Sequence, residues 1–275
     1  MRVLHVHEIA YIPRFLVAEL RKRGVEAEFA EEADAAKIKD FDVVHGHYAL
    51  NKKTIRAFRL ARRLDIPFIL HCHGSDVRLL TGTGRRPLPF HYNAISKYMR
   101  KRSAKVFLST PDLIGFAPEG EYVPNPVNLE VFRPMPDVEK SDRILICGKQ
   151  VKGSPLPDLI KPDKQYDCVN TGHEFDFPGN VRVLPFVERD RFPAFLNRYR
   201  AMIGTVGDVI SMARLEAMAC GLRTFTMFEE KFTEFYEGQN PDKAGDPRAF
   251  VERFHNPEIA VSRLVKAYET AARSL

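Results

Sequence analysis

Short apolar runs alternate along the first half of the chain with stretches of amphipathic helical spacing. The apolar runs predict strands, and the segments with a period near 3.6 residues predict helices. The predicted strands are 2–7, 25–30, 42–47, 67–74, 105–110 and 121–125, and the predicted helices are 13–24, 51–64 and 91–102. Strands that alternate with helices in this way are typical of βαβ units, whose strands form a parallel sheet.

A proline-rich segment separates this series from a second one. Residues 124–142 contain four prolines and little periodicity, which predicts a connector. The strands predicted after it are 143–149, 166–172, 181–186, 201–206 and 223–228, and the helices are 190–200, 211–221, 247–254 and 257–274. We expect an α/β protein with two doubly wound, Rossmann-like domains at 1–130 and 131–275 that face each other across a cleft. The last helix could pack back on the first domain.

Length and composition agree with two domains and narrow the class of protein. The chain has 275 residues, of which 44% are hydrophobic, so it can bury a large core. It has no run of eighteen apolar residues and no charged-then-apolar leader at Met1. We therefore expect neither a spanning helix nor a signal peptide, and a cytoplasmic location. Single cysteines in apolar runs, none with CxxC spacing, predict buried thiols at Cys72, Cys147, Cys168 and Cys220.

Positive charge is concentrated in the first half of the chain. The net charge is +6, and residues 131–275 contribute none of it. Between Lys52 and Lys105, 14 basic residues are accompanied only by Asp65 and Asp76 as acids. This tract predicts an anionic partner such as the surface of an anionic membrane, and a solvated helical face is the alternative. Nucleic acid is a weaker candidate, because aromatic residues for base stacking do not interleave with these charges.

Three predicted strands end in two histidines at positions i and i+2, on one face of the strand. The pairs are His5 with His7, His45 with His47, and His71 with His73. Such pairs could bind a metal as in metallohydrolases. A hydrolase would need further ligands, however, and the second half offers only His173 and His255. We therefore predict no metal site and keep a metal-dependent hydrolase as an alternative.

The third pair continues into HCHGSD, residues 71–76, which adds a glycine, a hydroxyl and a carboxylate. At the carboxyl end of a strand, His73 and Asp76 could position and deprotonate a hydroxyl nucleophile. We take both as candidate catalytic residues. A purely structural turn is the alternative.

A glycine-flanked loop with two lysines follows the first strand of the second series. Gly148 and Lys149 come directly after the apolar run, and Lys152 follows three residues later. Two ammonium groups there suit a pyrophosphate, although the loop matches neither a P-loop nor a GxGxxG fingerprint. Ordinary surface lysines would also explain the pattern.

One acid, Glu216, lies inside the small and apolar helix SMARLEAMACG, which ends at Gly221. A buried carboxylate needs a partner or a purpose, so Glu216 either forms a structural ion pair or binds a ligand. Ser211 is a plausible N-cap, and the helix N-terminus would attract phosphate oxygens. Asp208 lies just before the helix, and both acids could accept hydrogen bonds from sugar hydroxyls.

Four segments resemble, in the same order, the retaining GT-B glycosyltransferases of family GT4. They are DVVHGHYA (42–49), HCHGSD (71–76), YVPNPVNLEVFRP (122–134) and LEAMACGLRTFT (215–226). The resemblance implies a GT-B fold and a metal-independent, retaining hexosyltransferase that moves a sugar from a nucleotide-diphosphate sugar to a hydroxyl acceptor, either a glycan or a lipid-linked molecule. The nucleotide-sugar is a substrate, so no cofactor is implied. The enzyme would be cytoplasmic or peripheral on the inner face of the membrane.

The resemblance also implies roles for single residues. Glu216 matches the second acid of the family's E-x7-E motif, which holds the ribose. Asp208 matches the first acid, which contacts the donor sugar, so Asp208 joins His73 and Asp76 as a candidate catalytic residue. Lys149 and Lys152 match the basic pair that grips the diphosphate. His73 matches the acceptor-domain histidine beside the transferring sugar.

Several positions depart from the family pattern. Asp208 is shorter than the usual Glu, Lys149 replaces an Arg, and the first loop, 7–13, lacks the usual glycine pair. The changes at Asp208 and Lys149 favour a further alternative, a catalytically silent protein of the same fold that binds a nucleotide or a glycan.

Overall fold

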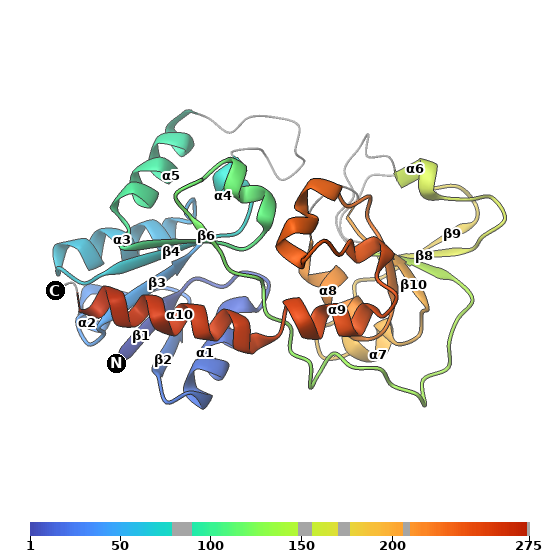
Figure 1. The fold of residues 1–275 in the computed structure, drawn as a ribbon, viewed down its shortest axis with the longest axis horizontal. Helices are drawn as coiled ribbons and strands as arrows, with labels where there is room; N and C mark the ends of the chain where they lie inside the picture. The colour runs from blue at the N-terminus through green and yellow to red at the C-terminus, as the bar shows by residue number, and fades with distance from the viewer. Residues whose placement is uncertain (79–89, 148–155, 170–176, 206–209, 274–275) are drawn as a thin grey trace. The chain divides into compact units, whose positions relative to one another are not determined.

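The computed structural model describes residues 1–78, 90–147, 156–169, 177–205 and 210–273. The chain divides into two compact units, each drawn as a sheet with its own helices in Figure 1. Unit 1 consists of residues 1–126 together with 257–275, and unit 2 consists of residues 127–256.

Unit 1 is built on a six-stranded sheet. Its strands are β1 (Arg2–Val6), β2 (Glu26–Ala30), β3 (Val43–His47), β4 (Phe68–Cys72), β5 (Lys105–Leu108) and β6 (Glu121–Tyr122). Their spatial order is β2-β1-β3-β4-β5-β6, and all pairs are parallel. The order reverses between β1 and β3, which makes their carboxyl ends the topological switch point of this sheet.

Helices cover both faces of the unit 1 sheet. They are α1 (Ile12–Lys22), α2 (Ala35–Ile38), α3 (Lys52–Arg63), α4 (Ser75–Arg78), α5 (Phe90–Arg102), the 3-10 helix η1 (Pro111–Gly115) and α10 (Pro257–Ala272). Leu4, Val6 and Leu70 pack in one core with Phe58 of α3 and Met99 of α5. On the opposite face, α10 and α1 contact each other, α10 lies against β3 and α1 against β1 (Figure 1). Because side chains alternate along a strand, histidines 5, 45 and 71 face this second layer.

Unit 2 has a five-stranded parallel sheet with the order β11-β10-β7-β8-β9. The strands are β7 (Ile144–Ile146), β8 (Tyr166–Val169), β9 (Val181–Leu184), β10 (Ala201–Ile203) and β11 (Arg223–Phe225). The helices are α6 (Leu156–Leu159), α7 (Phe192–Leu196), α8 (Met212–Ala219), η2 (Glu230–Tyr236), η3 (Pro241–Lys243) and α9 (Pro247–Phe254). Here the order reverses between β7 and β10, so their carboxyl ends form the switch point.

The α/β class and the alternation of strands and helices are confirmed, and the differences are local. The helix predicted at 190–200 is only α7, because the Asn197 side chain donates to the carbonyl of Arg133 and accepts from the N–H of Met135, which ties the chain to the connector. The four cysteines are buried and free, as predicted. None of the helices in the described part of the chain has the length and apolar character needed to span a bilayer.

Candidate functional site

Histidines from three adjacent strands form one buried layer in unit 1. The register pairs His5 with His45 and His47 with His71, so the three HxH pairs lie side by side across β1, β3 and β4. His5 Nδ1 lies 3.0 Å from His47 Nε2, and His47 Nδ1 lies 3.1 Å from His73 Nε2, so these three rings form a hydrogen-bonded row. Sequence alone predicted each pair but not this convergence.

Burial favours the neutral form of five of these imidazoles, those of His5, His45, His47, His71 and His73. Desolvation, with the nearby His71 ring as a smaller cause, lowers the pKa of His5 to about 3, and desolvation lowers the pKa of His71 to about 3. Burial also lowers the pKa of His45, His47 and His73 well below 6.5. Neutral imidazole keeps a lone pair on one nitrogen, so the layer offers hydrogen-bond acceptors or metal ligands inside the fold.

Helix α10 supplies a residue that the sequence reasoning missed. Tyr268 Oη lies 2.6 Å from His45 Nδ1 and 3.2 Å from His5 Nε2. Tyr268 is fully buried. The sequence does place Tyr268 on the apolar stripe of the last helix, which predicts that it is buried. A buried tyrosine hydroxyl needs a polar partner, so this position could have indicated a contact with the histidines.

Asp76 holds the turn that follows β4. One carboxylate oxygen accepts from the backbone N–H groups of His73 and Gly74, at 3.0 and 2.9 Å, and the other accepts from Ala49 at 2.9 Å. The residue is fully buried, and burial raises the pKa of its carboxyl while these hydrogen bonds lower it. Gly74 has φ +137°, a conformation that L residues rarely adopt. Asp76 therefore fixes the backbone on which His73 is presented.

In unit 2, Glu216 forms a two-pronged ion pair with Arg189. Arg189 Nη1 donates to Oε2 at 2.7 Å, and Nη2 donates to Oε1 at 2.5 Å. Glu216 is only 2% exposed, whereas the Arg189 side chain is 34% exposed and stacks over the Phe132 ring at 4.7 Å. Burial raises the pKa of the Glu216 carboxyl, and Arg189 opposes that rise. The sequence left open whether Glu216 forms a structural ion pair or binds a ligand, and the ion pair is present. Nothing in the sequence indicated that Arg189 would be its partner.

Ser211 caps helix α8 as its sequence position indicated. Its Oγ accepts from the Arg214 N–H at 3.3 Å, and Gly221 ends the helix with φ +85°. The first N–H groups of a helix have no acceptor within that helix, and its dipole adds positive potential at this end. The end of α8 at Ser211 can thus accept an anion.

Four candidate residues fall outside the described residues. Gly148, Lys149 and Lys152 belong to 148–155, and Asp208 belongs to 206–209. The strands that lead into these two segments are neighbours, since the Cys147 N–H donates to the Ile203 carbonyl at 3.0 Å.

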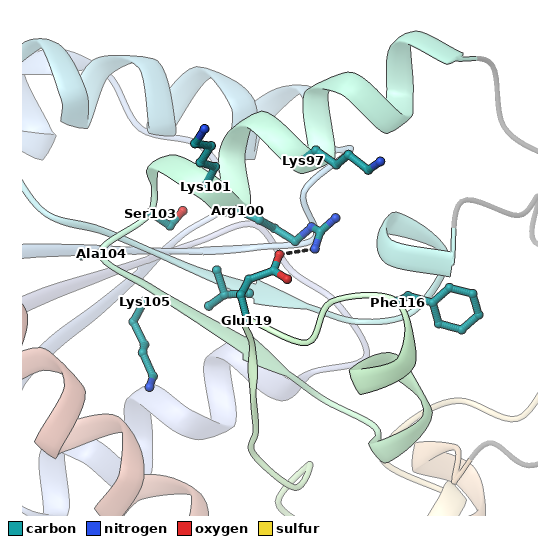
Figure 2. Close-up of a pocket in the computed structure, with 9 residues that line it drawn as sticks. Lys97, Arg100, Lys101, Ser103, Ala104, Lys105, Phe116 and Glu119 are labelled. Carbon is teal, nitrogen blue, oxygen red and sulfur yellow. Dashed lines mark hydrogen bonds and ion pairs between the residues drawn. The ribbon is translucent and has the colours of Figure 1, made fainter.

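Basic side chains gather on the α3 and α5 side of unit 1. A concavity of about 460 Å³ runs along α3 and is lined by Lys52, Ile55, Arg56, Arg59, Leu60 and Arg63. A second concavity, of about 550 Å³, has Lys97 and Lys101 of α5 among its lining residues. Figure 2 shows Arg100 of the same helix paired with Glu119. Arg62 donates to the Tyr98 hydroxyl at 2.5 Å, which joins the two helices.

The whole chain is similar in fold to solved GT-B glycosyltransferases. HepE from Anabaena in complex with UDP-glucose has a TM-score of 0.65 and 10% identity, with 98% of this chain and 100% of that chain covered. Sucrose-phosphate synthase from Thermosynechococcus elongatus has a TM-score of 0.68 and 11% identity, with both chains covered in full. No family model matches the sequence, and no curated protein sequence matches it. The chain therefore has the GT-B fold, with two Rossmann-like domains.

The same fold is shared with enzymes of another class. The UDP-GlcNAc 2-epimerase from Methanocaldococcus jannaschii has a TM-score of 0.53 and 10% identity, over 98% of this chain and 100% of that chain. At such identities the likeness establishes the fold, and the reaction has to be argued from the residues.

Proposed function

We propose that the protein is a retaining, metal-independent glycosyltransferase that moves a sugar from a nucleotide-diphosphate sugar to a hydroxyl acceptor. The observation that supports this proposal is the switch point of the unit 2 sheet, where β7 and β10 are neighbours and Ser211 caps the helix that follows β10. Segments 148–155 and 206–209 each begin just beyond the switch-point strands β7 and β10, and Ser211 caps the helix that follows. In doubly wound sheets this edge is where nucleotides bind.

In this proposal the donor is bound without a metal. Lys149 and Lys152 offset the charge of the diphosphate, and the N-terminus of α8 donates N–H groups to phosphate oxygens. Asp208 accepts hydrogen bonds from the donor sugar. These groups stabilise the negative charge that grows on the leaving diphosphate as the glycosidic bond breaks.

Glu216 has the capacity to bind the ribose while it stays paired. Each carboxylate oxygen has two lone pairs, and Arg189 uses one on each oxygen. In this proposal the remaining lone pairs accept from two adjacent ribose hydroxyls, which must reach a carboxylate that is only 2% exposed. The Arg189 pair would then hold the carboxylate in a fixed orientation, as a supporting residue does in an organised binding site.

On unit 1, His73 is assigned an electrostatic and positioning role toward the acceptor hydroxyl. Its Nε2 is engaged with His47, which fixes the ring. Asp76, whose two oxygens both accept from backbone N–H groups, is assigned to hold the turn that carries His73. The acceptor would be a glycan or a lipid-linked molecule.

Donor binding can be tested by thermal shift with UDP-, GDP- and ADP-sugars, each with and without EDTA. A ligand at 100 times its Kd stabilises the folded state by about 2.7 kcal/mol, which is a shift of several degrees. We expect one nucleotide to raise the Tm, with no effect of the chelator. Glu216→Gln should remove this shift, and the exposed Glu188→Gln should keep it. If no nucleotide-sugar shifts the wild-type Tm, the proposed function is wrong.

We further propose that the α3 and α5 face of unit 1 docks on an anionic membrane surface, which would place the enzyme in the cytoplasm on the inner face of the membrane. Arg56, Arg59 and Arg63 are exposed on α3. Phe90, at 84% exposure, and Tyr98, at 50%, add apolar rings on α5 that suit the interface between headgroups and acyl chains.

Sedimentation with vesicles that contain 30 mol% phosphatidylserine tests this surface. Each basic residue near such a membrane contributes about 1 kcal/mol, so Arg56→Gln, Arg59→Gln and Arg63→Gln together should weaken binding about 100-fold. The matched control is Arg198→Gln, Arg200→Gln and Arg223→Gln, which removes three exposed charges of unit 2. Equal weakening in both triple variants would show that only net charge matters and would contradict a docking face.

A further inference from the structure

Three histidines of the buried layer bring ligand-capable nitrogens close together. Each of His5, His45 and His47 offers one nitrogen, and these three atoms lie within 4.8 Å of one another. All three residues are 0% exposed. His45 Nε2 is buried and has no hydrogen-bond partner among the described residues. A buried nitrogen without a partner is costly, and a bound group that satisfies it would remove that cost.

We propose that His5, His45 and His47 bind one late first-row transition-metal ion inside unit 1. Imidazole nitrogens are the ligands that zinc and copper accept readily, whereas magnesium and calcium prefer oxygen. Complete burial separates the ion from any substrate, which gives it a structural role and makes it no part of sugar transfer.

Tyr268 is placed to orient two of the three ligands. A phenolic oxygen has two lone pairs, so Tyr268 Oη can accept from His45 Nδ1–H and from His5 Nε2–H. Those tautomers leave His45 Nε2 and His5 Nδ1 as bare lone pairs, and the latter already lies 3.0 Å from His47 Nε2. Metal-ligating histidines commonly donate their second N–H to such an acceptor.

A second trio, His47, His71 and His73, also has nitrogens within 4.8 Å of one another. Two observations favour the first trio. Among the described contacts, the second trio has no oxygen that accepts from two of its histidines, as Tyr268 Oη can in the first trio. His73 of the second trio is also only partly buried. Both trios use His47, so substitutions at His45 and His71 tell them apart.

Metal binding is measured on the full-length protein after removal of metals with a chelator. The protein is dialysed against Zn²⁺, against Cu⁺ kept reduced with ascorbate, or against Mg²⁺, and the retained metal is quantified by mass spectrometry. We expect one equivalent of Zn²⁺ or Cu⁺ and no Mg²⁺. The Zn²⁺ and Cu⁺ arms identify the ion. If the wild-type protein retains neither ion, the proposal is wrong.

Variants test the ligand set. His45→Gln should lower the affinity at least 100-fold, and Tyr268→Phe should lower it about 10- to 100-fold because the ligands lose their orientation. His91→Gln, at an exposed histidine of the same unit, should retain full binding. Circular dichroism in chelator shows whether each variant is folded. An affinity equal to that of the wild type in folded His45→Gln or Tyr268→Phe, or a loss of binding in His71→Gln that His45→Gln does not show, would overturn the assignment.

Discussion

Replacing Arg189 with methionine should destabilise the protein by about 3–5 kcal/mol, because it leaves the Glu216 carboxylate buried without a partner. Glu216→Gln should destabilise the protein less than Arg189→Met does, since the partly exposed Arg189 can turn toward water. Replacing both residues, with Arg189→Met and Glu216→Leu, should restore the free energy of unfolding to within about 1 kcal/mol of wild type. Urea unfolding of the three variants measures the coupling between the two residues.

The pH dependence of Arg189→Met provides an independent check. Burial already raises the pKa of Glu216, and removal of Arg189 removes the main opposing cause. A carboxyl whose folded-state pKa lies above its unfolded value binds protons more tightly when folded, so its unfavourable effect grows as pH rises through the folded pKa. The loss in the free energy of unfolding caused by Arg189→Met should therefore be smaller at pH 5 than at pH 8. A deficit that does not change with pH would contradict a buried, unpaired carboxylate.

The same double variant separates the two roles of Glu216. If the acid serves only the ion pair, a stable Arg189→Met, Glu216→Leu protein should bind the nucleotide-sugar as the wild type does. If Glu216 also accepts from the ribose, the double variant should fold normally and lose the thermal shift. Isothermal titration with the nucleotide selected by the thermal-shift panel distinguishes these outcomes.

Asp76→Asn should destabilise unit 1 by about 2–4 kcal/mol although the side chain keeps its shape. The carboxylate accepts from three backbone N–H groups, and an amide oxygen can replace only one of its two oxygens. In the orientation that keeps the His73 and Gly74 bonds, the new NH₂ group faces the Ala49 N–H, so donor meets donor in a buried site. Thermal unfolding and hydrogen exchange of residues 43–76 measure the loss.

Serine at the neighbouring position supplies the control for Asp76. Ser75→Ala removes a hydroxyl that bonds the Tyr48 hydroxyl at 2.8 Å in a partly buried place, so it should cost less than about 1.5 kcal/mol. An Asp76→Asn protein as stable as the wild type but unable to transfer sugar would mean that Asp76 acts on the acceptor directly, as a general base does.

Local patterns in the sequence were sufficient for the architecture but not for the partners of the site residues. The alternation of apolar runs and helical periodicity predicted the parallel sheets, and Ser211 and Gly221 predicted both ends of α8. The Glu216 helix showed that a buried acid needs a partner, yet Arg189 lies 27 positions away on a loop without any periodic signal. Contacts of this kind depend on tertiary packing, which a single sequence does not display.

The histidine layer shows the same limit. Each HxH pair was visible as two residues on one face of a strand, but the strand order β1-β3-β4 and its register decide that the pairs meet. Tyr268 reaches them from a helix 223 residues beyond His45 in the chain. The prediction of no metal site rested on the lack of further ligands in the second half of the chain, whereas the assembled positions of the pairs bring three candidate ligands together within unit 1.

The place of α10 in the chain has a consequence for synthesis on the ribosome. Unit 1 needs this helix to cover the face that carries the histidines, but α10 follows all of unit 2. At roughly 5–20 residues per second, translation of the intervening segment takes on the order of ten seconds. The part of this face that α10 covers is therefore open to water and chaperones for that time, and the imidazoles exposed there lie beside the apolar ring of Phe107.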